Sequence, residues 1–196
     1  MATVTSATRH LPNDRWPSVL RDKLGPDFCV IAEGLNGCTT VFDDPIDGAH
    51  KNGRTYLLAC LESHAPLDLV IIMLGTNDLK SRFGLGAHDI AAGAGQLVKL
   101  VSADLRGQNG IRPQVLLVCP CPIGPLKLLS DMFAGGVEKS QRLHVFYTQI
   151  AALLGCHLLN AGTYVCCSPV DGVHLDAEQQ HALGLAIADT VQEIFA

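Results

Sequence analysis

Two segments of this chain are apolar at almost every position: LDLVIIMLG at residues 67–75 and PQVLLVCP at residues 113–120. Both are rich in branched side chains and are shorter than a typical helix, so we predict that they are β-strands. A strand with one face in water alternates apolar and polar residues, and these runs do not alternate. We therefore predict a parallel sheet whose two faces are both buried under helices.

The segments around these strands supply the helices and further strands that such a sheet needs. Helical patterns occupy residues 15–25, 56–65, 89–106, 135–155 and 176–196, and shorter apolar strands are predicted at residues 27–35 and 156–162. Because helices and strands alternate without a linker or repeat, we predict a single α/β domain over residues 1–196. We expect a three-layer arrangement with about four to five strands, preceded by a flexible or rearranged N-terminal segment at residues 1–12.

Charge and hydropathy narrow the class of partners. The formal net charge is −5 and there is no run of Lys or Arg, which argues against nucleic acid and acidic membrane surfaces. No apolar stretch reaches the roughly 20 residues of a membrane span. Residues 1–16 contain no apolar signal core, so a cytoplasmic location is the expectation.

The chain contains eight Cys residues, several of them within apolar runs. In a chain without a secretory signal we expect them to be reduced thiols that pack as small apolar groups. A metal site is the alternative interpretation. However, Cys119-x-Cys121 and the adjacent pair Cys166 and Cys167 lack the C-x2-C spacing of zinc sites. The sequence therefore predicts no metal site.

Polar clusters follow two of the predicted strands, GLNG at residues 34–37 and GTND at residues 75–78. An Asn at the end of a strand can direct its amide into a cleft, and such a donor stabilises a developing oxyanion by about 3 kcal/mol. Gly, Asn and Asp are also common in plain turns. Since parallel sheets carry their working residues on the loops after the strands, we expect these clusters to border one site.

A third cluster, DGVH at residues 171–174, lies just before the last helix. Asp171 and His174 are suited to act as an orienting acid and a proton-accepting base. The alternative is an ordinary loop, with Asp176 as the N-cap of the helix. The long loops at residues 42–54 and 121–136 are candidate walls of a pocket.

Taken in order, EGLNGCTT (33–40), LDLVIIMLGTND (67–78) and VDGVHLDAEQQHALG (170–184) resemble the SGNH (GDSL) hydrolase family. The resemblance is closest to its arylesterase and acyltransferase branch, and it covers nearly the whole chain from Arg15 onwards. It implies a flavodoxin-like strand order and hydrolysis of small-molecule esters through a Ser nucleophile, with no cofactor.

The same resemblance assigns roles to residues of the matching motifs. Gly37 and Asn77 are expected to donate hydrogen bonds to the oxyanion. Asp171 and His174 are expected to be the acidic and basic members of the catalytic triad. Thr76 is expected to line the acyl pocket.

The sequence departs from the family at its start. The family opens with an apolar strand followed by Gly-Asp-Ser, whose Ser is the nucleophile, and Gly-Asp-Ser occurs nowhere in this sequence. The nucleophile is therefore unknown. Ser6 is a candidate, although it follows neither a strand nor a Gly-Asp turn. Ser81 and Ser168 are no better placed, and the Cys38 thiol is a further alternative.

The missing first strand would lie between the strands predicted at 27–35 and 67–75. Each buried backbone group left unpaired costs about 1–3 kcal/mol, in a domain with only about 5–15 kcal/mol of net stability. Four solutions are open: the flanking strands close up, residues 2–8 fill the slot, another chain supplies a strand, or the strand lies upstream of residue 1. An unpaired edge also favours a homo-oligomer.

Two functions from different classes follow. The first is an ester hydrolase of the arylesterase or acetylesterase type, with acyl transfer to alcohols as a related activity. The second is a truncated, catalytically impaired family member that acts as a binding or assembly domain.

Overall fold

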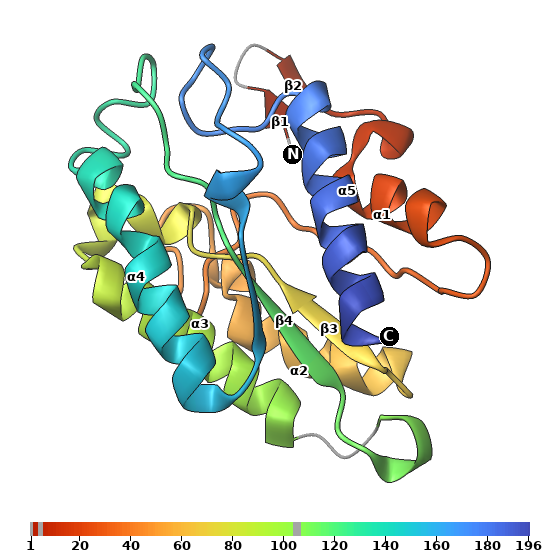
Figure 1. Cartoon of the computed structure of the whole chain (residues 1–196). Helices are drawn as coiled ribbons and strands as arrows, with labels where there is room; N and C mark the ends of the chain where they lie inside the picture. Colours follow the sequence, from red (N-terminus) through yellow and green to blue (C-terminus); the bar gives the residue numbers. More distant parts are fainter. Residues whose placement is uncertain (1, 4–5, 104–106) are drawn as a thin grey trace.

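The computed structural model describes residues 2–3, 6–103 and 107–196. At its centre three parallel strands form a sheet in the order β3-β4-β5, with β4 in the middle (Figure 1). The strands are β3 (Leu69–Ile72), β4 (Gln114–Cys119) and β5 (His157–Asn160). The strands predicted near residues 67–75, 113–120 and 156–162 are therefore confirmed.

Helices cover both faces of this sheet, as Figure 1 shows: α1 and α5 lie side by side on one face, and α3 and α4 on the other. The helices are α1 (Trp16–Leu24), α2 (Gly53–His64), α3 (Ala87–Ala103), α4 (Gly136–Leu154) and α5 (Ala177–Ile194). None of the helices in the described part of the chain is long and apolar enough to cross a membrane.

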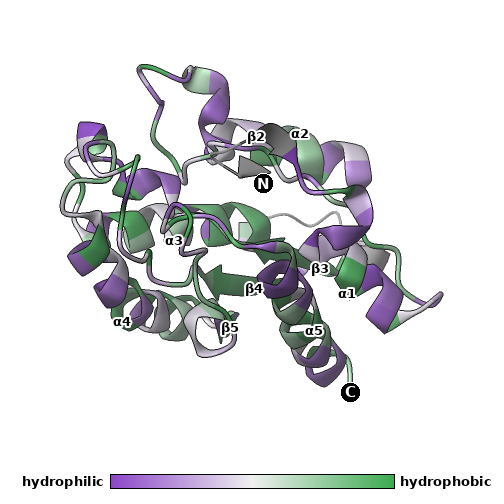
Figure 2. Ribbon diagram, turned by 90° about the horizontal axis from the view of Figure 1, so that it is seen from above, coloured by the Kyte–Doolittle hydropathy of each residue, from purple (hydrophilic) through white to green (hydrophobic). Residues whose placement is uncertain are grey.

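Alternate residues of β4 contribute to two separate hydrophobic clusters. Leu116 and Val118 pack with residues of α1 and α5, whereas Val115, Leu117 and Cys119 pack with residues of α3 and α4. All five are buried. Figure 2 shows the same arrangement as green strands between helices that carry both green and purple residues. The predicted α/β fold with both faces of the sheet covered is confirmed.

The number of strands is lower than expected, because residues 27–35 form no strand. Phe28 and Val30 still pack in the cluster of α1 and α5, beside Leu69 and Ile71 of β3. Within the described residues, no strand pairs with β3 on the side away from β4. A β-strand forms only where its backbone N–H and C=O groups can bond to a neighbouring strand. The neighbour expected for residues 27–35 was the family's first strand, which has no counterpart among the predicted strands. The prediction of a strand there is therefore wrong.

The start of the chain pairs with itself. β1 (Ala2–Thr3) and β2 (Ser6–Arg9) form a separate antiparallel sheet, so these strands do not extend the central sheet beside β3. The guanidinium of Arg9 donates to the carbonyl of Gly34 at 2.8 Å. His10 Nε2 lies 3.0 Å from the carbonyl oxygen of Leu175. These contacts attach the N-terminal segment to the loops at the end of the sheet where β3 and β4 finish.

Candidate active site

The DGVH motif folds into a turn that its own Asp stabilises. The backbone amides of Val173 and His174 donate to Asp171 Oδ1 at 2.8 and 2.9 Å. The other carboxylate oxygen, Oδ2, lies 2.9 Å from His174 Nδ1. Gly172 has a φ of +78°, and a Cβ there would lie 2.5 Å from the carbonyl oxygen of Pro125. Only Gly fits this position, because both the dihedral angle and the close approach exclude a side chain.

The environment of Asp171 determines which nitrogen of His174 carries a proton. Burial alone would raise the pKa of Asp171, but the amide bonds from His174 and Val173 and the contact with the His174 ring outweigh it, so this pKa is lowered. Asp171 is therefore ionised at neutral pH and can only accept hydrogen bonds. Nδ1 of His174 then holds the proton, which leaves Nε2 free to accept one. The His174 side chain is 26% exposed, whereas that of Asp171 is 2% exposed.

The turn after β3 places Asn77 beside the preceding loop. Gly75 has a φ of +119°, and a Cβ there would clash with the Tyr147 hydroxyl oxygen at 2.4 Å. That hydroxyl donates to the carbonyl of Leu74 at 2.7 Å and so fixes the end of the strand. Asn77 Nδ2 donates to the carbonyl of Cys38 at 3.1 Å. Since a carboxamide has two N–H donors, one remains for a ligand.

A buried carboxylate joins the two loops that carry Gly37 and Asn77. Asp78 accepts hydrogen bonds from the backbone amide of Thr40, at 3.0 and 3.1 Å, and from its hydroxyl at 2.5 Å. Burial raises the pKa of Asp78 to about 6, although the bonds from Thr40 act in the opposite direction. In the sequence Asp78 is the last residue of GTND and no motif assigns it a role. Its position next to Asn77 is the one sequence feature that could have indicated this role.

The loop of Gly37 is held by a lysine. Gly37 has a φ of +78°, and the Lys51 side chain lies against it. Lys51 Nζ donates to the carbonyl of Asn36 at 2.7 Å. This contact fixes the turn on which Gly37 stands at the edge of the pocket.

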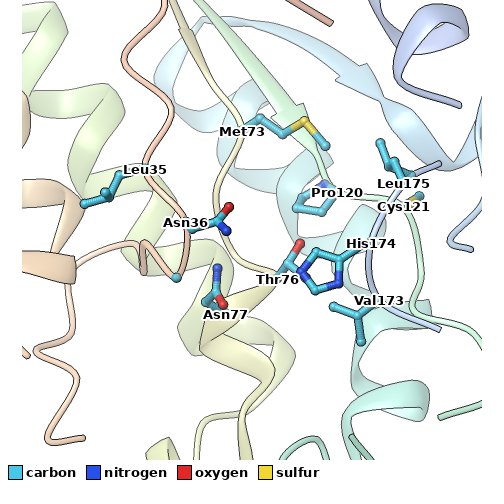
Figure 3. A pocket seen from close by; sticks show the side chains of 11 residues that line it. Leu35, Asn36, Met73, Thr76, Asn77, Pro120, Cys121, Val173, His174 and Leu175 are labelled. Atoms are coloured by element: carbon cyan, nitrogen blue, oxygen red, sulfur yellow. The ribbon is translucent and has the colours of Figure 1, made fainter. Parts of the chain in front are cut away.

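The three loops enclose one cavity of about 80 Å³. In Figure 3 the His174 ring lies on one side of this pocket, and Asn36 and Asn77 lie on the other. The predicted residues Gly37, Thr76, Asn77 and His174 all line it, and Asp171 lies directly behind His174. Further lining residues belong to segments that were already expected at the site, namely Leu35, Asn36, Cys121 and Val173. The lining residues that no motif indicated are Met73, Pro120 and Leu175.

The predicted pocket walls are largely wrong. Residues 42–54 do not line the pocket, and Cys121 is the single lining residue from 121–136. The first loop is instead attached through buried Asp44, which accepts from Arg82 at 2.7 Å and from Lys80 at 3.4 Å. Burial raises the pKa of Asp44, but amide bonds from Asp47 and Ile46 and the contacts with Arg82 and Lys80 outweigh this effect and keep it well below its usual range. The loop is therefore part of the structural support rather than the pocket wall.

The described lining residues include no Ser. Thr76 supplies the one hydroxyl among them and Cys121 the one thiol. Burial raises the pKa of the Cys38 thiol to about 11, so Cys38 is a neutral thiol at pH 7 and a poor nucleophile. The backbone of Ser6 begins β2, and its side chain lies outside the described part of the chain. Ser168 is buried in the DGVH loop, where its Oγ accepts from the amide of Val170.

The cysteines are free thiols. Across residues 2–3, 6–103 and 107–196, no group of three His, Cys, Asp or Glu side chains is arranged to hold a metal ion. Cys121 and Cys167 are nevertheless in contact, with their sulfur atoms 3.4 Å apart. In the sequence each of the two is part of a different closely spaced Cys pair, and nothing there indicates that they meet.

The sequence model of the GDSL-like Lipase/Acylhydrolase family matches residues 3–183. The chain belongs to this family. No curated protein matches the chain. Several solved structures of esterases do match it.

Two of these solved structures are similar to the GDSL-like chain over nearly its full length. Est24, a carbohydrate acetylesterase from Sinorhizobium meliloti, is 41% identical with a TM-score of 0.93, and the match covers 98% of this chain and 92% of that one. An aryl esterase from M. smegmatis is 39% identical with a TM-score of 0.90, and the match covers 95% and 88% of the two chains. At this level of similarity the chain is an esterase-type GDSL family member.

Proposed function

We propose that this chain carries an ester-hydrolysing site in which His174 is the base, Asp171 orients it, and Asn77 and the Gly37 amide stabilise the oxyanion. The observation that carries the proposal is the 2.9 Å contact between Asp171 and His174 at the edge of the cavity that Asn77 and Gly37 line. A base oriented by a carboxylate and facing convergent N–H donors is the arrangement that acyl transfer requires.

The reaction proceeds in two halves. In a chain that carries the family's Gly-Asp-Ser strand, the Ser hydroxyl attacks the ester carbonyl, its proton passes to His174 Nε2, and the carbonyl oxygen becomes an oxyanion held by Asn77 and Gly37. The intermediate then expels the alcohol, which takes the proton from His174, and leaves an acyl-enzyme. Water, activated by the same imidazole, hydrolyses the acyl group. An alcohol in place of water would give acyl transfer.

The proposed substrates are small acyl esters, above all acetyl esters. The small cavity supports this choice, as does the similarity to a carbohydrate acetylesterase and an aryl esterase. Thr76 and Met73 are the proposed contacts of the acyl group, since both line the cavity.

A second function, binding without turnover, is favoured by one observation. The described lining residues include Thr76 and Cys121 but no Ser. A chain that keeps the base and the oxyanion donors without a nucleophile would bind esters and hydrolyse them only slowly.

An assay with p-nitrophenyl acetate separates the two functions. We would compare the 196-residue chain with an extended form, in which the same chain is preceded by an apolar strand that ends in Gly-Asp-Ser. Each form is assayed with and without His174→Ala. His144→Ala is the matched control, because His144 is an exposed residue of α4 outside the pocket.

The hydrolase proposal predicts turnover by the extended form, a loss of about 10⁶-fold with His174→Ala, and no change with His144→Ala. If the 196-residue chain is inactive and the extended form is active, the 196-residue chain has the binding function. Activity of either form that survives His174→Ala would overturn the proposed site. Labelling with a fluorophosphonate reports separately whether any Ser is activated.

A further inference from the structure

Two thiols that the proposed function does not use meet beside the pocket. Cys121 and Cys167 are 46 residues apart in the chain, and their sulfur atoms lie 3.4 Å apart. A disulfide needs an S–S separation of about 2.05 Å. The two sulfur atoms therefore need to approach by little more than 1 Å, which is within the reach of small side-chain and loop adjustments.

The two residues lie on different parts of the site. Cys121 follows the end of β4 by two residues and lines the pocket, as Figure 3 shows. Cys167 lies in the segment that precedes the DGVH turn, and its thiol donates to the carbonyl of Val173 at 3.2 Å. One residue further on, the Ser168 amide donates to the carbonyl of His174 at 2.6 Å. A bond between the two sulfurs would join the end of the sheet directly to the turn of His174.

The pair also has the chemistry that oxidation needs. The contact with the Cys167 sulfur lowers the pKa of Cys121, although burial opposes this effect. The pKa of Cys167 is instead raised well above its usual range, first by its bond to Cys121 and then by burial. Cys121 is therefore the thiol of the pair that gives up its proton more readily. Cys121 is 5% exposed but forms part of the pocket wall, and the pocket is the route we propose for a small oxidant.

We propose that Cys121 and Cys167 form a reversible oxidation site at which a peroxide converts the two thiols into a disulfide. The Cys121 thiolate attacks one peroxide oxygen and displaces hydroxide, which gives a sulfenic acid. The Cys167 sulfur then attacks the Cys121 sulfur, and the sulfenic oxygen leaves as water. In total, two thiols and one hydrogen peroxide give one disulfide and two waters.

The disulfide would alter the turn that carries His174. It removes the S–H donor of the Val173 carbonyl and draws the segment of Cys167 towards Cys121. The catalytic consequence rests on the proposed function of His174, whereas formation of the bond does not. A misplacement of about 1 Å at a reacting group can cost about 10²-fold in rate, so we expect oxidation to lower esterase activity by at least 10-fold.

Peptide mapping tests the bond itself. The full chain is treated with hydrogen peroxide, alkylated, digested without reduction and analysed by mass spectrometry. We expect a Cys121–Cys167 cross-linked peptide and the loss of two free thiols, both reversed by dithiothreitol. Cys166→Ser is the matched control, because Cys166 is exposed and adjacent in sequence to Cys167; it should leave the cross-link intact, whereas Cys167→Ser should abolish it.

Three results would overturn the proposal: oxidation of Cys121 to sulfinic acid without a cross-link, pairing of Cys167 with a different Cys, or both thiols remaining reduced at a peroxide concentration that oxidises the exposed Cys29. All three results are measured on the chain without substitutions, so they do not depend on whether a variant folds. Assay of the Gly-Asp-Ser-extended form before and after oxidation then reports on activity. A cross-link that forms in a protein without esterase activity would count against the proposed function and not against the oxidation site.

Discussion

Asp171 fixes both the backbone and the imidazole of one turn. One of its oxygens binds two backbone amides of the turn, and the other binds the ring of His174. Asp171→Asn preserves the first interaction, because an amide oxygen still accepts. Its NH₂ group, however, would donate to Nδ1 of His174 and move the ring proton to Nε2. In the extended, active form we expect kcat to fall about 10⁴-fold with little change in the urea midpoint.

Kinetics with p-nitrophenyl acetate and urea unfolding check this prediction. An Asp171→Asn form that keeps wild-type kcat would show that Asp171 serves only the fold. A fall in kcat that is accompanied by a large fall in the urea midpoint would point to the same conclusion.

Asp78 gives a prediction about pH. An Asp in an unfolded chain has a pKa of about 3.9, and burial raises that of Asp78 to about 6 in the folded protein. Because the folded pKa is the higher one, the folded state binds more protons between these values. Stability from this group therefore falls as pH rises from about 4 to about 6, and it is constant above that range.

Urea unfolding of the wild type and of Asp78→Asn between pH 4 and pH 8 isolates this effect. The free energy of unfolding of the wild type, relative to the variant, should fall through this window and then level off. A relative stability that rises with pH would mean that the bonds from Thr40 dominate over burial.

At the scale of elements, the position of each strand and helix follows well from the sequence where the signal is local. The continuous apolar runs at 67–75 and 113–120 contain β3 and β4. α1 ends at Leu24, one residue before the end of the predicted range 15–25, and α5 begins at Ala177, after the expected cap Asp176. Asp176 occupies the cap position, but its side chain makes no capping hydrogen bond.

The errors occur where structure depends on distant partners. Residues 27–35 have the composition of a strand, but the chain offers no described neighbour for them beside β3. Motif order predicted that Gly37, Asn77 and His174 would meet, since they follow strands or precede a helix at one edge of a sheet. The contact between Cys121 and Cys167 has no local signal, because it depends on how β4 and the last loop pack.

The turns of the site give a prediction with an internal control. Gly155 and Gly172 have φ values of +64° and +78°, but only Gly172 has a neighbour, the Pro125 carbonyl oxygen, that a Cβ would touch. Gly155 lies in the left-handed region with a ψ of 37°, so Gly155→Ala should cost about 1–2 kcal/mol through its dihedral angles alone. Gly172→Ala should cost at least about 1 kcal/mol more through the clash. Urea unfolding of both variants measures the difference, and equal costs would mean that the loop of Pro125 yields without strain.

At the scale of the whole molecule, one edge of the central sheet stands out: among the described residues, no strand pairs with β3 on the side away from β4. Leu69, Val70 and Ile71 are half-buried although they belong to a strand of the central sheet. Unpaired strand edges with apolar side chains favour pairing with another chain. We predict that the 196-residue chain self-associates through this edge. The extended form should self-associate less, because its added strand would pair with β3.

Size-exclusion chromatography with light scattering at several concentrations measures this association. The apparent mass of the 196-residue chain should rise with concentration, and that of the extended form should rise less. If the 196-residue chain stays monomeric at all concentrations, the edge of β3 does not pair with another chain.

In the proposed site three loops distant in the chain converge on one oxyanion, and a crystal structure of the extended form inactivated by a small fluorophosphonate would locate that oxyanion. We expect a phosphonyl oxygen about 2.7–3.1 Å from both the Gly37 amide and Asn77 Nδ2, with His174 Nε2 within hydrogen-bond reach of the modified Ser. A phosphonyl oxygen that points away from Gly37 and Asn77, or a His174 ring turned out of the pocket, would contradict it.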